Sequence, residues 1–121
     1  MKMPLIFERH FFYHFMNVED IRNYALSLPD VTESFPFGES VLVFKTKGKM
    51  FLLLPLDTPD LQFNVKCDPE LAVELREEFP DTVLPGYHMN KKHWNTVMVN
   101  GNISKNKLLE MISNSHQLVR K

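Results

Sequence analysis

The spacing of apolar residues along the chain predicts three helices. Asn17 is placed as the N-cap of a first helix that ends at Pro29. Pro69 opens a second helix that stops at Pro80, and Ser104 caps a third that runs to the C-terminus. Each helix has one apolar stripe at helical spacing. The stripes are Val18, Ile21, Ala25 and Leu28, then Leu71, Leu75 and Phe79, then Leu108, Met111, Ile112, His116 and Val119.

Shorter apolar segments between these helices predict strands. Residues 41–46 and 49–54 form a hairpin whose turn is Lys47-Gly48, and residues 96–100 form another long strand. The segment "LQFNVKC" alternates, so Phe63 and Val65 should face the core while Asn64 and Lys66 face outward. Residues 32–35 suit a short edge strand. The predicted fold class is α+β: an antiparallel sheet of four or five strands with three helices packed on one face.

The composition narrows the class of protein. The chain has 121 residues, of which 44% are hydrophobic, and a net charge of -1. It has no global basic field, so any nucleic acid must bind a local patch. The chain contains no apolar run of about 18 residues, which is the length that a membrane-spanning helix needs. Cys67 is the only cysteine, which excludes an internal disulfide and fits the cytoplasm.

The helical pattern begins at Met16, which is a plausible natural start. We therefore divide the chain into an N-terminal extension, residues 1–15, and a single domain, residues 16–121. The extension is apolar but is interrupted by charged residues and histidines, so it makes a poor secretory signal. We expect a monomer, with dimerisation through residues 1–15 as the alternative.

The segment "LPGYHMNKKHWNTV", residues 84–97, concentrates candidate chemistry. His88 and His93 are five residues apart, so they could not chelate one ion from one face of a helix. We expect no metal and no cofactor, with each histidine bonded to loop backbone or half-buried. Cys67 precedes a helix start that could lower its pKa, but a buried, inert thiol is the preferred interpretation.

Anion binding is the remaining chemistry for this segment. Asn90 suits the N-cap of a short turn formed by Lys91, Lys92 and His93, whose free N–H groups would attract a phosphate. Trp94 would anchor the turn in the core or, if exposed, stack on a base. A second basic cluster, at the hairpin turn, consists of Lys45, Lys47 and Lys49. For the first cluster the preferred alternative is a core Trp94 with solvated lysines, and for the second a solubilising hairpin tip is just as natural.

The same residues resemble the signature of a known family. "PGYHMNKKHWNTV", together with "LPDVTESFPFG" and "VLVFKTKGKMFLLL", looks like the MmcQ/YjbR family of small bacterial proteins. The resemblance implies a frataxin-like (CyaY-like) fold and DNA binding through a double wing, and it implies no enzymatic activity. The wings would fall on residues 45–49 and on Asn100-Gly101. His116 departs from the family pattern, which has tyrosine there. The matching signature residues are Gly86, Tyr87, His88, Asn90, Lys91, Lys92, His93 and Trp94.

Three functions compete at this stage. The leading hypothesis is a non-enzymatic protein that binds DNA weakly and non-specifically through Lys45, Lys47, Lys49, Lys91 and Lys92. The first alternative is a protein- or small-ligand-binding module built on residues 88–94. The second is an enzyme that pairs His88 or His93 with a carboxylate such as Glu33 or Glu39.

Overall fold

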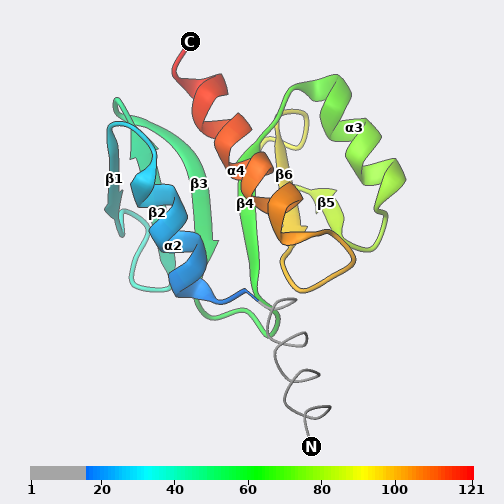
Figure 1. The fold of residues 1–121 in the computed structure, drawn as a ribbon, viewed down its shortest axis with the longest axis horizontal. Helices are drawn as coiled ribbons and strands as arrows, with labels where there is room; N and C mark the ends of the chain where they lie inside the picture. The colour runs from blue at the N-terminus through cyan, green and yellow to red at the C-terminus, as the bar shows by residue number, and fades with distance from the viewer. Residues whose placement is uncertain (1–15) are drawn as a thin grey trace, which may run out of the picture.

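The computed structural model describes residues 16–121 as one antiparallel sheet with three helices (Figure 1). The strand order across the sheet is β1-β2-β3-β4-β6-β5, and every neighbouring pair is antiparallel. The elements in chain order are α2 (Val18–Ser27), β1 (Val31–Ser34), β2 (Val41–Thr46), β3 (Lys49–Pro55), β4 (Gln62–Lys66), α3 (Pro69–Glu78), β5 (Val83–Pro85), β6 (Trp94–Met98) and α4 (Lys105–Val119).

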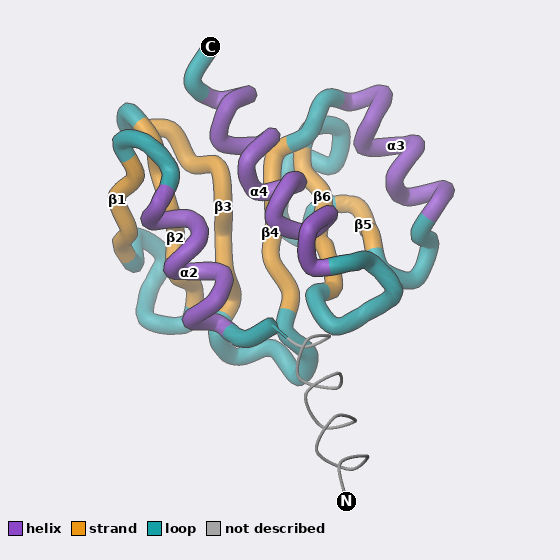
Figure 2. The backbone as a smooth tube through the Cα atoms, viewed as in Figure 1, coloured by secondary structure: helices purple, strands orange, loops and turns teal. Residues whose placement is uncertain are grey.

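The three helices cover one face of the sheet, as the sequence predicted (Figure 2). Ile21 of α2, Leu75 of α3 and Ile112 of α4 join one core with Phe44 and Phe63 of the sheet. Two of the predicted N-caps form their bonds. The Asn17 side chain accepts from the backbone of the first turn of α2, and Ser104 does the same for α4. Pro69 opens α3 without a side-chain cap.

The sheet has six strands, so the predicted count of four or five was wrong. The missed strand is β5, a three-residue segment that pairs Val83 with Val97 and Pro85 with Asn95. The backbone of β5 is held by its pairing with β6, and no alternation of apolar and polar residues within β5 predicts it. The last long strand also begins earlier than expected. Trp94 is its first residue, whereas the sequence placed that strand at 96–100.

The other face of the sheet carries a row of side chains that runs across five strands. The row pairs Val43 with Leu53, Leu53 with Asn64, Asn64 with Thr96, and Thr96 with Leu84. Asn64 was expected to face outward, yet it is only 6% exposed. The loop after β5 folds back over this face, and its Tyr87 N–H donates to Thr96. The alternation of β4 therefore predicts the correct face of the sheet for Asn64, but the loop after β5 covers that face at this position.

Strands β3 and β4 separate toward the end of the sheet where the C-terminus lies (Figure 1). Leu53 pairs with Asn64 and Leu52 with Val65, so Phe51 and Lys66 would form the next pair. The hydroxyl of Ser115, from α4, lies between them instead. It donates to Phe51 O at 2.6 Å and accepts from Lys66 N at 2.9 Å. A helix side chain therefore replaces one step of the β-ladder.

The neighbouring residue of α4 ties that helix to the turn after α2. His116 Nε2 lies 2.8 Å from Pro29 O, and its ring packs edge-on against Phe51. His116, where the resemblance expects tyrosine, is thus a buried packing residue.

The prediction that residues 1–15 form an extension, through which the chain could dimerise, concerns residues that the structure does not describe. No helix within residues 16–121 is long and apolar enough to cross a membrane.

Candidate functional site

The loop between β5 and β6, residues 86–93, is held tightly at both ends. Gly86 N donates to Trp94 O at 2.9 Å. A Cβ at Gly86 would lie 2.8 Å from the Trp94 Cβ, so this approach requires glycine. Trp94 is 8% exposed and packs with Val43 and Leu53. It is an anchor of the loop, and it is too buried to stack on a base.

The turn at Asn90 forms as the sequence suggested, but its amide groups are used internally. Asn90 Oδ1 accepts from Lys92 N at 2.9 Å, and Asn90 O accepts from the N–H groups of His93 and Trp94. Few free N–H groups remain for a phosphate. Lys91 and Lys92 are exposed, so their ammonium groups, and not a backbone cradle, carry the attraction for anions.

The aromatic residues of the loop project from it. The rings of Tyr87 and His88 lie 3.9 Å apart between centroids, and Tyr87 is 67% exposed. His88 has a φ of 59°, a conformation that side-chain-bearing residues seldom adopt. Within residues 16–121, neither His88 nor His93 forms a side-chain hydrogen bond. Of the two expected alternatives, a bond to loop backbone is absent for both imidazoles there, whereas His93 is half-buried as expected and His88 is exposed.

Basic residues from distant parts of the sequence gather at one end of the sheet. Because the strands are antiparallel, the β2–β3 turn, the end of β4 and the start of β6 share this end, with the end of α4 beside them (upper end of Figure 1). We call it the basic end. It carries Lys45, Lys47, Lys49, Lys66, Lys91, Lys92, Arg120 and Lys121.

A shallow groove of about 420 Å³ lies at the basic end. Lys49, Lys66 and Lys121 line it, beside Trp94. None of the lysines at the basic end forms an ion pair within residues 16–121, while Arg120 binds Asp30 at 3.1 Å. The sequence interpretation missed Lys66 and Lys121. Lys66 is the last residue of β4 and Lys121 follows the end of α4, so strand order and the path of α4 together bring both to this end.

A group of acidic residues lies at the opposite end, which we call the acidic end, although Asp30, Asp68 and Glu70 lie near the basic end. It holds the start of α2, the loops before β2 and β4, and the approach to β5. Its carboxylates are Glu19, Asp20, Glu39, Asp57, Asp60 and Asp81. Asn100-Gly101, the second wing implied by the resemblance, follows β6 and lies at this end. The two implied wings are therefore at opposite ends of the sheet.

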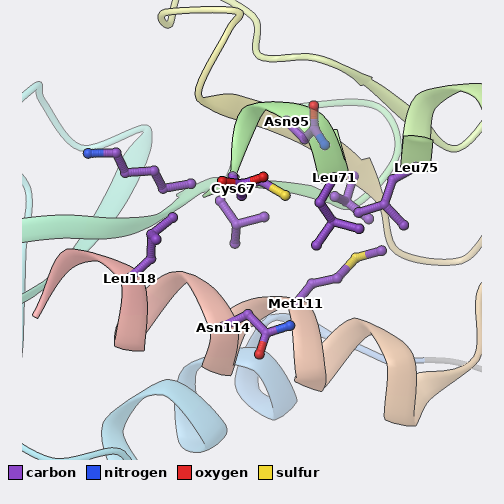
Figure 3. A pocket seen from close by; sticks show the side chains of 11 residues that line it. Cys67, Leu71, Leu75, Asn95, Met111, Asn114 and Leu118 are labelled. Carbon is purple, nitrogen blue, oxygen red and sulfur yellow. The ribbon is translucent and has the colours of Figure 1, made fainter. Parts of the chain in front are cut away.

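A small cavity of about 130 Å³ lies between α3 and α4 (Figure 3). Leu71, expected in the core, is 39% exposed and lines this cavity, because Ala72 and Leu75 make the buried contacts of α3. Cys67 is half-buried beside it. Burial, with a smaller contribution from the charge of Asp68, raises the pKa of the Cys67 thiol. The thiol is therefore poorly activated, in line with the inert interpretation.

Of the two carboxylates named for a catalytic pair, Glu33 is already engaged, whereas Glu39 is exposed and forms no ion pair or side-chain hydrogen bond within residues 16–121. Glu33 accepts from Arg22 Nε at 2.7 Å and from Nη2 at 2.6 Å. This bidentate contact lowers the pKa of Glu33. Among residues 16–121, no hydrogen bond or ion pair joins His88 or His93 to any carboxylate. The described residues also hold no cluster of three or more side chains suited to a metal ion.

Comparison with known proteins supplies the family. The model of the YjbR family matches residues 26–118. The chain belongs to the YjbR family. The uncharacterised protein YbdF of Escherichia coli O157:H7 is 39% identical over 84% of this chain and 82% of its own length. The uncharacterised protein YjbR of Escherichia coli K12 is 26% identical over 84% of this chain and 86% of its own.

Solved structures of similar sequence share this fold. A crystal structure of Deinococcus radiodurans protein DR2400, of domain family DUF419, superposes with a TM-score of 0.84 at 38% identity. It covers 89% of this chain and 81% of the other. A Pseudomonas syringae crystal structure gives 0.70 at 28% identity, over 85% of this chain and 98% of its own. The resemblance to the YjbR family is thus confirmed, and these relatives assign no activity.

Proposed function

We propose that this YjbR-family chain is a non-enzymatic protein of the cytoplasm that binds DNA weakly and without sequence preference, as a monomer. The contact surface would be the basic end. The single observation that carries the proposal is the convergence there of unpaired lysines from the β2–β3 turn, the β4 end, the Asn90 turn and the C-terminus. The frataxin-like architecture implied by the resemblance stays a prediction.

The separation of charge explains how a chain of net charge -1 could attract a polyanion. The screening length is about 8 Å at physiological salt. A phosphate at the basic end therefore responds to the lysines near it more than to the carboxylates at the far end of the sheet. Local charge, and not net charge, decides whether the phosphate backbone is held.

The hairpin turn adds a second argument. Lys47 has a φ of 52° and Gly48 a φ of 81°, so two residues with positive φ form the turn. Such turns favour Asn-Gly, and a lysine at the first position costs conformational energy. A charged side chain held at a costly position, at the tip of a basic surface, suits a phosphate contact better than a purely structural role.

No arrangement in the described residues favours the enzyme hypothesis. The two loop histidines lack carboxylate partners, and Glu33 is occupied by Arg22. In many active sites a hydrogen-bond partner orients the general base. We therefore assign the loop a binding role.

Fluorescence anisotropy with a labelled duplex would test the proposal. Non-specific contacts of this kind give dissociation constants of roughly micromolar or weaker at physiological salt. The logarithm of affinity should fall linearly with the logarithm of salt, with a slope of about -0.9 for each phosphate engaged. The double variant Lys91→Ala/Lys92→Ala should flatten this slope by about two units.

A matched control uses the acidic end. Lys105→Ala/Lys107→Ala removes the same charge from the start of α4, so it should leave the slope unchanged. The proposal fails if no binding occurs at low salt, or if both double variants change the slope equally. In the second case the duplex would respond to net charge and not to the basic end.

A further inference from the structure

The sheet face opposite the helices contains a pocket that the DNA proposal does not use. Its volume is about 440 Å³, which is within the range of about 300–1,000 Å³ common for small-molecule sites. The loops before β2 and β4 and the loop after β5 surround it. The lining residues that matter here are Phe37, Val41, Leu53, Asn64, Tyr87 and Met89. Most of this lining is apolar, and no lysine contributes to it.

One buried polar group opens into this pocket. Asn64 is 6% exposed, and its Oδ1 accepts from the Thr96 hydroxyl, which in turn accepts from Tyr87 N. This chain of bonds fixes the carboxamide so that Nδ2 points away from Thr96. Asn64 Nδ2 has no hydrogen-bond partner within residues 16–121. No fully buried side-chain polar atom is unpaired there, so the NH₂ group is accessible, and Asn64 lines the pocket.

Aromatic side chains stand exposed at the rim of the same pocket. Phe37 is 60% exposed and Tyr87 is 67% exposed, and both contribute to its lining. His88, beside Tyr87, holds its strained φ of 59° at this rim. Strained backbone and exposed large aromatic groups are each unfavourable in an isolated domain. A flat molecule between Phe37 and Tyr87 would cover the apolar surface that they expose.

We infer that this pocket binds a small, flat aromatic molecule bearing a carbonyl oxygen, with that oxygen accepting from Asn64 Nδ2. The apolar floor of Val41 and Leu53 fits the ring, and Met89 adapts to its outline. Asp57 also lines the pocket, which favours a neutral carbonyl over a carboxylate. The inference goes beyond DNA binding and does not depend on it, because the pocket uses none of the lysines at the basic end.

Two related compounds test the inference on the full, isotope-labelled chain by NMR. Indole and oxindole have the same bicyclic outline, but only oxindole carries a carbonyl oxygen. Oxindole should shift the side-chain NH₂ resonances of Asn64 and the backbone resonances of Leu53 and Tyr87. It should bind about fivefold more tightly than indole, the gain expected from one additional neutral hydrogen bond.

Matched variants locate the contact. Asn64→Leu keeps the size of the side chain and removes the donor, so the two compounds should then bind equally. Asn114→Leu makes the same substitution on α4 beside the other cavity, and it should leave the preference for oxindole intact. If Asn64→Leu does not fold, the comparison of indole with oxindole on the unmodified chain still tests the inference.

Two results would overturn the inference. The first is that oxindole, at several millimolar, shifts no resonance of the pocket. The second is that indole and oxindole bind equally to the unmodified chain with the Asn64 NH₂ resonances unmoved. If Asn114→Leu abolishes the preference for oxindole, the ligand occupies the cavity between α3 and α4, and the assignment to Asn64 is also refuted.

Discussion

Replacing Ser115 by alanine should destabilise the fold far more than the loss of one surface hydroxyl would. Ser115 is fully buried and bonds both to Phe51 O and to Lys66 N. Ser115→Ala leaves the buried Phe51 O and the partly buried Lys66 N without this partner, at a cost of about 1–3 kcal/mol for a fully buried group and less for a partly buried one. Alanine favours the helix by about 0.5 kcal/mol, which offsets a small part of this. We expect a net loss of about 2–4 kcal/mol.

Urea unfolding followed by circular dichroism would measure this loss. Ser113→Ala is the matched control, because Ser113 lies on α4 two residues earlier, is only partly buried and bonds to no other side chain or backbone group within residues 16–121. It should change the free energy of unfolding by less than about 0.5 kcal/mol. If the two variants unfold at the same urea concentration with equal slopes, then Ser115 does not substitute for a step of the ladder between β3 and β4.

Further predictions concern single residues elsewhere. Trp94→Ala should cost roughly 3–5 kcal/mol in urea unfolding, and a loss below about 1 kcal/mol would show that Trp94 is not an anchor of the loop. Lys47→Asn should raise the free energy of unfolding by about 0.5–1 kcal/mol, since Asn tolerates positive φ, while it weakens duplex binding in anisotropy. Equal binding by this variant would remove Lys47 from the DNA surface. The folded-state pKa of Glu33 lies below its ordinary value of 4.5, so its ion pair stabilises the fold above that pH and is lost as pH falls below it. Glu33→Gln should therefore flatten the pH dependence of unfolding in this acid range, and an unchanged profile would contradict the pairing with Arg22. Cys67 should react with a thiol reagent more slowly than free cysteine at neutral pH, and an equal rate would refute the raised pKa.

The elements with their own local signals were predictable from the sequence. The helices carry N-cap residues and apolar stripes, and the α4 stripe from Leu108 to Val119 is buried as expected. In contrast, β5 is a three-residue segment ending in proline, and it exists because β6 pairs with it. The burial of Asn64 also depends on a loop that returns over the sheet, which alternation cannot encode.

The candidate site was predictable in part. The sequence identified Lys45, Lys47 and Lys49 as one cluster and Lys91 and Lys92 as another, because each cluster is local. Their convergence with Lys66 and Lys121 depends on strand order and on where α4 ends. Likewise, Ser115 has the ordinary appearance of a helix serine, and only the separation of β3 from β4 gives it a role.

The unpaired lysines at one end of the sheet and the carboxylates at the other make the charge distribution of the described residues uneven, although the net charge of the chain is -1. At low ionic strength, the basic end of one copy would face the acidic end of the next. Such a contact is head-to-tail, so it would build rings or open chains of copies according to its rotation, in place of the proposed monomer. Added salt shortens the screening length from about 30 Å at 0.01 M to about 10 Å at 0.1 M and weakens this attraction. Self-association and duplex binding would therefore compete for the same lysines, and each would shield the basic end from the other.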